Sequence, residues 1–148
     1  MPPYTYSHPH PAVAVDVVVL ALRNDVLEVL LIERARDPYA GRWALPGGFV
    51  GIDEDLADAA RRELREETSL AAGPLQQIGA FGAPQRDPRE RVISVAFWTR
   101  LDSAQPARAG SDARTAAWFP VDRLPPLAFD HGQIVAAALR AAGNLRRP

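Results

Sequence analysis

The feature that most constrains this chain is a glycine turn followed at once by an acidic helix. The turn contains Gly47-Gly48, and the segment that follows, as far as Thr68, has the composition of a helix rich in glutamate. Asp53 is the predicted N-cap of a helix that begins near Glu54, because its side chain can accept a hydrogen bond from a first-turn amide. The stretch therefore predicts a loop and a helix that present several carboxylates at one place.

The glutamates of this helix lie on its inward face. At about 100° per residue, Glu63, Glu66 and Glu67 fall within an arc of roughly 100°. The arc continues the apolar stripe of the preceding turns, whereas a solvated acidic face would lie on the opposite side, with Asp58, Arg61 and Arg65. Like charges on a partly buried face repel one another unless a cation neutralises them. Because carboxylate oxygens suit hard cations, the pattern favours a site for Mg²⁺ or Mn²⁺.

The neighbours of the glutamates suggest what such a cation would bind. Arg62 lies one turn before Glu66 and can pair with it. A Gly-Gly pair alone is a weak signal, since it is common in turns. Directly before the helix, however, Gly47-Gly48 brings bare backbone close to the cation, and glycine backbone and helix N-termini accept anions at short range. A cation together with an anion indicates phosphate chemistry.

The rest of the chain predicts one mixed α/β sheet with helices on its faces, since runs of strand-like sequence alternate with helices. Asn24-Asp25 predicts a tight hairpin turn between two nearly continuous apolar strands, which belong in the middle of a sheet that is covered on both faces. The expected strands are 12–22, 26–32, 43–45, 75–81, 92–101 and 115–121. A second helix is expected over 130–142, with Asp130 as its N-cap and Gly143 as its stop.

Composition narrows the classes of function. The chain of 148 residues predicts a single domain over 12–148, preceded by an extended arm over 1–11 that contains four prolines. It has no cysteine, which excludes disulfides and a cysteine-ligated zinc site, and no lysine, which excludes a Schiff base. A net charge of −1 gives no general case for binding nucleic acid or acidic membranes. Without a signal peptide or a spanning apolar run, a cytoplasmic location is expected.

The spacing of these residues resembles the Nudix box. Gly48, then Glu54, then the run from Arg62 to Leu70 follow that pattern of a Gly, a Glu and Arg-Glu-hydrophobic-x-Glu-Glu-x-Gly-hydrophobic at fixed spacings over 23 residues. The one departure is Ser69, where the pattern has Gly. A Ser in a left-handed helix end would cost about 1 kcal/mol, and the alternative is a helix that ends differently, at Gly73.

The resemblance extends over roughly 12–142, and its other segments are similar to the ADP-ribose pyrophosphatase branch of the family. These segments are 43–50, 85–89, 118–120 and 127–131. The resemblance implies a Nudix-type α/β/α sandwich in a single domain, a small-molecule nucleotide substrate and a homodimer. The same branch includes regulators with an added winged-helix domain. The intact glutamates and the end of the chain soon after the last helix favour an enzyme over such a regulator.

What the resemblance implies is Mg²⁺- or Mn²⁺-dependent hydrolysis of a nucleoside diphosphate linked to another group, foremost ADP-ribose, which gives AMP and ribose 5-phosphate. Glu63, Glu66 and Glu67 would be metal ligands, with the Gly47 carbonyl as a further one. Glu54 would support the site and Arg62 would orient the glutamates. The alternatives are an enzyme that cleaves oxidised nucleoside triphosphates and a non-catalytic sensor that binds ADP-ribose.

The general base and the substrate contacts are less constrained. Glu67 or Glu66 is the first expectation for the base, and an acid from a distant loop is the alternative. The loop candidates are Asp112, Glu90 and Asp87, since Thr115 stands where the family often has a glutamate. Arg34, Arg86 and Arg89 are candidates for binding phosphate. Trp43 and Phe49 are candidates for stacking on a base, although both also suit core packing, and His131 is expected to be structural.

Overall fold

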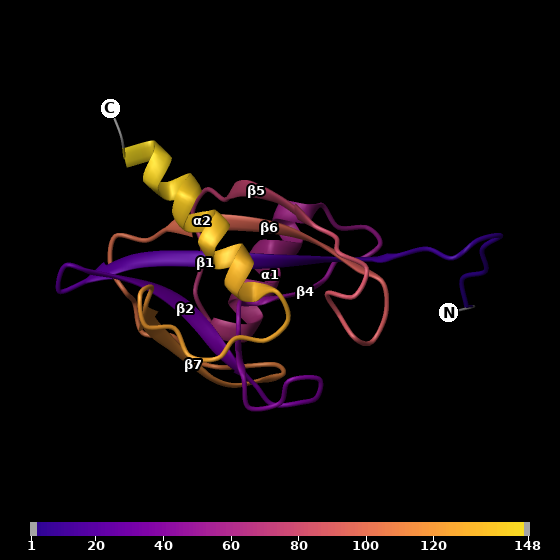
Figure 1. Cartoon of the computed structure of the whole chain (residues 1–148), viewed down its shortest axis with the longest axis horizontal. Helices are drawn as coiled ribbons and strands as arrows, with labels where there is room; N and C mark the ends of the chain where they lie inside the picture. Colours follow the sequence, from indigo (N-terminus) through magenta and orange to yellow (C-terminus); the bar gives the residue numbers. More distant parts are fainter. Residues whose placement is uncertain (1–2, 147–148) are drawn as a thin grey trace.

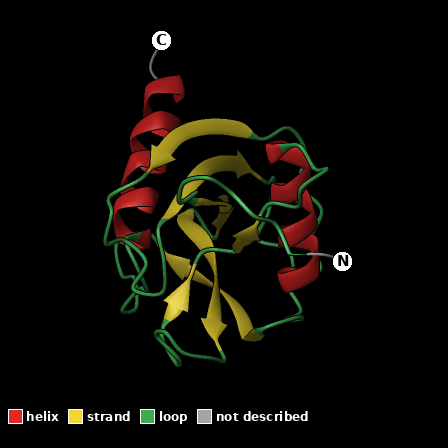
Figure 2. Ribbon diagram, turned by 90° about the vertical axis from the view of Figure 1, so that its right-hand side faces the viewer, coloured by secondary structure: helices red, strands yellow, loops and turns green. Residues whose placement is uncertain are grey.

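A computed structural model describes residues 3–146, which fold into a seven-stranded mixed sheet between two helices (Figure 1). Figure 2 shows one helix on each side of the sheet, so the predicted α/β/α sandwich is confirmed. The sheet has the order β3-β2-β1-β6-β5, with β4 paired to β1 and β7 paired to β2. The strands are β1 (Ala12–Arg23), β2 (Val26–Arg34), β3 (Trp43–Ala44), β4 (Gly47–Phe49), β5 (Gln76–Phe81), β6 (Val92–Arg100) and β7 (Ala113–Pro120).

The predicted hairpin and the central position of its strands are confirmed. Asn24 and Asp25 have φ of 51° and 64°, which is the left-handed backbone that a tight two-residue hairpin turn requires. β1 pairs with β2 on one side and runs parallel to β6 on the other. Its middle, from Val15 to Ala21, is buried, which explains its nearly continuous apolar sequence.

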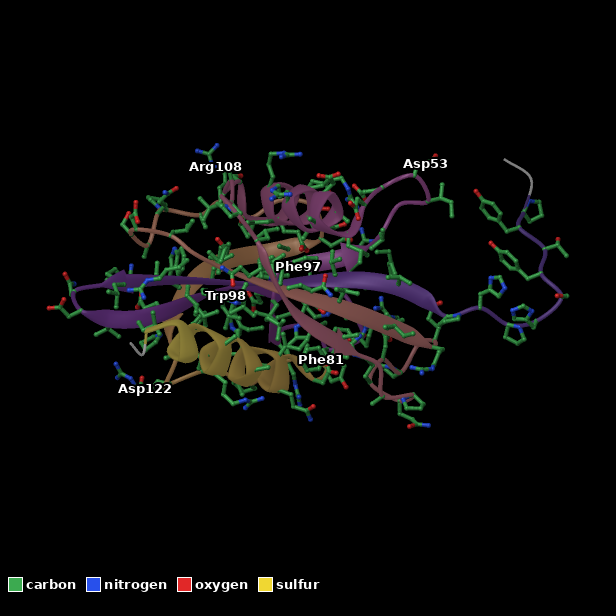
Figure 3. All side chains as sticks on the ribbon, turned by 90° about the horizontal axis from the view of Figure 1, so that it is seen from above. Asp53, Phe81, Phe97, Trp98, Arg108 and Asp122 are labelled. Atoms are coloured by element: carbon green, nitrogen blue, oxygen red, sulfur yellow. The ribbon has the colours of Figure 1, made fainter. Side chains whose placement is uncertain are left out.

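Two separate cores lie on the two faces of the sheet. Phe97 and Trp98 are neighbours in β6 and point to opposite faces, Phe97 towards α1 (Leu56–Thr68) and Trp98 towards α2 (His131–Arg146) (Figure 3). Helix α1 contributes Ala59, Ala60 and Leu64 to its core, and α2 contributes Ile134, Val135 and Ala138. The sheet is therefore clamped between the helices, and α1 is fixed against it by the same stripe that precedes the glutamates.

The glycine segment was predicted to be a loop, and this is wrong, because Gly47–Phe49 forms the short strand β4 and pairs antiparallel with β1. A Cβ on Gly47 would collide with the Val15 carbonyl oxygen, and a Cβ on Gly48 would lie 2.5 Å from the carboxyl carbon of Glu63. The glycines are thus required by close approach on both sides, and this approach lets the strand fit between β1 and α1.

The start of α1 differs from the prediction. Its N-cap is Asp55 and not Asp53, and the helix begins at Leu56, whose amide donates to Asp55 Oδ1 at 2.7 Å. The carboxylate of Glu54 is engaged elsewhere, because it accepts a hydrogen bond from the Gly51 amide at 2.9 Å. A hydrogen bond between Gly51 and the Glu54 side chain therefore stabilises the turn before Leu56.

The C-terminal ends of α1 and α2 can be compared with the predicted ends. Ser69 is the C-cap of α1 in left-handed backbone, with φ of 66° and ψ of 10°, so the helix ends there and not at Gly73. Helix α2 continues through Gly143 to Arg146, so the predicted stop is wrong. A glycine costs only about 1 kcal/mol within a helix, and nothing lies within 4 Å of a Cβ built on Gly143, so no contact forces the chain to turn there.

Because Ser69 has left-handed backbone, replacing it with glycine is expected to stabilise the protein. The gain should be about 0.5–1 kcal/mol in the free energy of unfolding, measured by urea denaturation, since glycine has no Cβ penalty there. It is reduced slightly by loss of the hydrogen bond from Ser69 Oγ to the Arg108 carbonyl at 3.2 Å. A lower free energy of unfolding in Ser69→Gly would show that this hydrogen bond outweighs the backbone cost.

The segment before β1 lies apart from the sheet. Residues 3–11 form no helix or strand and run away from the domain (Figure 1). The Tyr4 and Tyr6 rings are exposed and stack with centroids 6.3 Å apart. Within residues 3–146, neither helix has the length and apolar character needed to cross a membrane.

Candidate active site

Arg62 is the centre of a carboxylate cluster on the glycine side of α1. Its Nε and Nη2 donate to the two carboxylate oxygens of Glu54 at 2.6 and 2.9 Å. Its Nη1 donates to Glu63 at 2.8 Å and to Glu66 at 3.3 Å, and Nη2 also reaches the Phe49 carbonyl at 3.1 Å. The bonds from Arg62 and from a backbone amide lower the pKa of Glu54 to about 2, which keeps this carboxylate ionised. One guanidinium thus ties the start of the turn, β4 and two glutamates of the helix together.

Glu67 is buried in a different environment. Its side chain faces the glycine strand, and Oε1 accepts a hydrogen bond from the Gly47 amide at 2.8 Å. Burial raises the pKa of Glu67 to about 8, and the nearby charges of Glu63, Asp16 and Asp112 act in the same direction. No ion pair of Glu67 is found among residues 3–146. Within the described part of the chain, no cationic side chain therefore offsets the charge of this buried carboxyl when it ionises.

Glu63 and Glu66 differ in exposure. The Glu63 side chain is 14% exposed, lies against the backbone of Gly48 and has a pKa raised by burial. The Glu66 side chain is 45% exposed. The helical wheel explains the difference, because Glu66 lies at the end of the arc nearest solvent. The prediction of an inward face thus holds for Glu63 and Glu67 and only in part for Glu66.

The side chains present at this site fit a hard divalent cation, although Arg62 binds two of the carboxylates. Within residues 3–146 no three acidic, histidine or cysteine side chains form a ready-made metal cluster, because Arg62 takes one oxygen each of Glu63 and Glu66. The donors are all oxygens, as Mg²⁺ and Mn²⁺ prefer. A buried carboxyl with a raised pKa beside like charges is the environment that a cation would relieve.

The raised pKa of Glu67 predicts how the stability of the metal-free protein varies with pH. Between its value of about 4.3 in an unfolded chain and about 8 in the folded protein, this carboxyl is protonated when folded and ionised when unfolded. Raising the pH therefore favours the unfolded state, and stability is lost as pH rises through this window. In EDTA, the free energy of unfolding of Glu67→Gln minus that of the wild type should grow between pH 5 and 8, roughly the interval between those two pKa values. A difference that is constant over this range would contradict the burial of Glu67.

A cavity of about 80 Å³ adjoins Glu67 and Gly47. Its wall includes Phe49 and Phe129, and the guanidinium of Arg89 lies 5.8 and 5.7 Å from their ring centroids. Arg34, at the end of β2, lies 5.0 Å from the Phe129 centroid. Arg89 is held by Asp87 through hydrogen bonds of 2.7 and 3.0 Å. The cavity therefore combines two aromatic rings with two guanidinium groups.

The other predicted residues are more scattered. Asp112 lines a wider cavity together with the three glutamates and lies 3.6 Å from Arg36. Glu90 is exposed and lines neither cavity. Trp43 also lines neither, because its ring packs edge-on against Phe119 at 4.7 Å, so the structure places it in the core. Of the loop acids, Asp112 lines a cavity with all three glutamates, whereas Asp87 lines the other cavity with Glu67 and is paired with Arg89.

Arg86 lies on the floor of the cavity and not on an exposed loop. Its side chain is 4% exposed, and it donates to both carboxylate oxygens of Asp130 at 2.9 and 2.6 Å. Asp130 directly precedes α2, as predicted for its N-cap, but its carboxylate binds Arg86 and does not cap a helix amide.

Sequence reasoning did not single out Asp16, Ser94 or Phe129 as parts of this region. For Asp16 a signal existed, since it is the one charge inside the apolar strand β1 and is 6% exposed. Its Oδ2 accepts a hydrogen bond from Ser94 Oγ at 2.5 Å. Nothing in the sequence alone indicates that Phe129, which has a left-handed φ of 51° just before α2, would line the cavity.

Comparisons with known proteins show to which family the chain is related. The model of the NUDIX domain matches residues 10–138. The chain is 40% identical to the ADP-ribose pyrophosphatase of Methanocaldococcus jannaschii over 91% of its own length and 76% of that protein. It is 29% identical to the ADPR responsive transcriptional repressor NtrR of Acinetobacter baylyi over 95% of its own length, and it spans 58% of that repressor.

Solved structures give the same result. The NUDIX domain of Shewanella oneidensis NrtR, crystallised in complex with ADP ribose, superposes with a TM-score of 0.86 at 29% identity. The match covers 92% of this chain and 91% of that one. The likeness therefore extends over most of the chain.

Proposed function

The chain belongs to the Nudix family and is a Nudix hydrolase, and on this premise we propose that it cleaves the pyrophosphate bond of ADP-ribose into AMP and ribose 5-phosphate. The observation that supports this most directly is that the buried Glu67 and the partly buried Glu63 lie at the edge of an arginine-lined cavity. The identity to an ADP-ribose pyrophosphatase supports the substrate.

Glu63, Glu66, Glu67 and the Gly47 carbonyl would hold Mg²⁺ or Mn²⁺. When bound, the cation would neutralise charge that develops on the phosphoryl oxygens and make the attacking water more acidic. Glu67 accepts the proton of that water, with Glu66 as the alternative base. Arg62 orients Glu63 and Glu66 through its Nη1 and keeps the turn before the helix closed.

Arg34 and Arg89 are the proposed contacts to the pyrophosphate. Burial and the charge of Arg89 both lower the pKa of Arg34, so the two guanidinium groups repel one another in a partly buried wall. An anion between them would relieve that repulsion. Phe49 and Phe129 line the same cavity and can stack on a planar base.

A substrate panel tests this function. In Mg²⁺, kcat/KM for ADP-ribose should exceed that for oxidised nucleoside triphosphates by at least about tenfold, or 1.4 kcal/mol in transition-state binding. A preference for the triphosphates would contradict ADP-ribose as the substrate but not the hydrolysis of a phosphoanhydride bond. If no nucleotide is cut, a DNA gel shift with and without ADP-ribose tests the regulatory alternative, which the relationship to a repressor brings into view.

A further inference from the structure

A buried polar cluster lies under the cavity, beneath the proposed metal ligands. It joins four segments of the chain, and its members are Asp16, Arg86, Ser94, Asp130 and His131. The first and last of these are only 6% and 4% exposed. Burying so many polar groups costs folding free energy unless each group has a hydrogen-bond or ion-pair partner.

His131 connects this cluster to the glycine strand. Its Nδ1 accepts a hydrogen bond from the Leu45 amide at 3.0 Å, so Nδ1 must be unprotonated and the ring proton lies on Nε2. Nε2 lies 3.3 Å from Asp16 Oδ1, which orients the ring. Burial lowers the pKa of His131, and this favours the neutral ring that the geometry requires.

Leu45 is two residues before Gly47, and each residue from 45 to 47 has a backbone group held by a hydrogen bond. The Leu45 amide is held by His131, and the Pro46 carbonyl accepts from the Val17 amide at 2.9 Å. The Gly47 amide then donates to Glu67 at 2.8 Å. Asp16 lies directly across from Gly47 in the β1–β4 pair. A shift of the Leu45 amide would therefore move the donor that sets the Glu67 carboxylate.

We propose that His131, oriented by Asp16, is a positioning residue for the hydrolysis: through the Leu45 amide it fixes the strand whose Gly47 amide holds the Glu67 carboxylate. The inference rests on the proposed function for its catalytic part. His131 does not touch the reacting atoms and acts only through the backbone of 45–47. A histidine that only filled the core would stabilise the fold without setting the rate.

Two substitutions of His131 separate these roles. In His131→Asn the side-chain oxygen can take the place of Nδ1 and accept from Leu45. In His131→Gln the amide reaches towards Asp16, and the acceptor for Leu45 is lost. Both remove the ring and should lower stability, so a merely structural role would affect them alike. Gln133→Ala, at an exposed position of the same helix, is the matched control.

With ADP-ribose and saturating Mg²⁺, His131→Gln should lower kcat by about 10- to 100-fold with KM within about threefold, since misplacing a catalytic group by an ångström has that effect. His131→Asn and Gln133→Ala should stay within about threefold of wild type. Equal kcat in wild type and His131→Gln, or equal losses in Gln and Asn variants, would overturn the proposal.

Amide hydrogen exchange of the metal-free protein gives a readout that does not depend on activity. The Leu45 and Gly47 amides should exchange at least about tenfold faster in His131→Gln and stay protected in His131→Asn. Unchanged protection in His131→Gln would overturn the inference, whether or not the wild type cuts a nucleotide, whereas a wild type without hydrolysis would contradict only the proposed function. If His131→Gln does not fold, Asp16→Asn replaces it, with faster exchange at Leu45 expected and unchanged exchange contradicting the proposal.

Discussion

Replacing Glu67 with glutamine is expected to lower kcat for ADP-ribose by roughly 10³-fold, because the variant loses a metal ligand and the proposed base together. The amide is isosteric, and Glu67 is buried with the Gly47 amide as its one side-chain hydrogen-bond partner among the described residues, so the fold should be kept. Steady-state release of AMP, with circular dichroism to check the fold, measures the effect.

The matched control is Asp58→Asn, which removes one carboxylate from the exposed, opposite face of α1. Its kcat should equal that of the wild type. Glu66→Gln separates the two candidate bases: if Glu67 accepts the proton, this variant should lose less kcat than Glu67→Gln, and a larger loss would identify Glu66 as the base. Full activity in Glu67→Gln would remove this residue from the mechanism.

Alanine at Gly48 should lower activity, whereas alanine at Gly47 should lower stability. A Cβ at Gly48 would lie 2.5 Å from the carboxyl carbon of Glu63, the far end of a flexible side chain that can swing away. Gly48→Ala should therefore fold nearly normally and lose about 10²-fold in kcat, because Glu63 leaves the site. A Cβ at Gly47 would meet the Val15 backbone carbonyl, which cannot move. Gly47→Ala should lose about 3 kcal/mol in the free energy of unfolding.

Gly73→Ala is the control for both substitutions, since nothing lies within 4 Å of a Cβ built at that position. It should match the wild type in urea denaturation and in kcat. Full activity of Gly48→Ala would show that Glu63 can act from another position, and an unchanged stability of Gly47→Ala would show that β4 separates easily from β1.

Sequence patterning predicted the elements that depend on local chemistry. The hairpin at Asn24-Asp25 and the inward position of Glu63 and Glu67 follow from turn preference and helical period, and both were confirmed. The spacing of the box residues placed Arg62 within reach of the carboxylates. Helical periodicity and the spacing of a motif depend on residues close together in the sequence, so they can be recognised before the fold is known.

What sequence could not predict depends on contacts between distant segments. The Asp130 carboxylate resembled an N-cap, but Arg86, which is 44 residues away, takes it. Gly47–Phe49 resembled a loop, and pairing with β1 makes it a strand. Trp43 was a predicted candidate for base stacking, but in the structure its ring packs against Phe119. In each case a tertiary partner overrides a local preference, and a single sequence does not reveal that partner.

Hydrolysis of ADP-ribose should require a divalent cation, which is tested by analysing the products formed with Mg²⁺ and with EDTA. We expect AMP and ribose 5-phosphate in equal amounts with Mg²⁺, and neither product with EDTA. Folded protein that releases no AMP from ADP-ribose in Mg²⁺, or that releases it equally in EDTA, would contradict the assignment of Glu63, Glu66 and Glu67 to a cation-dependent pyrophosphate site.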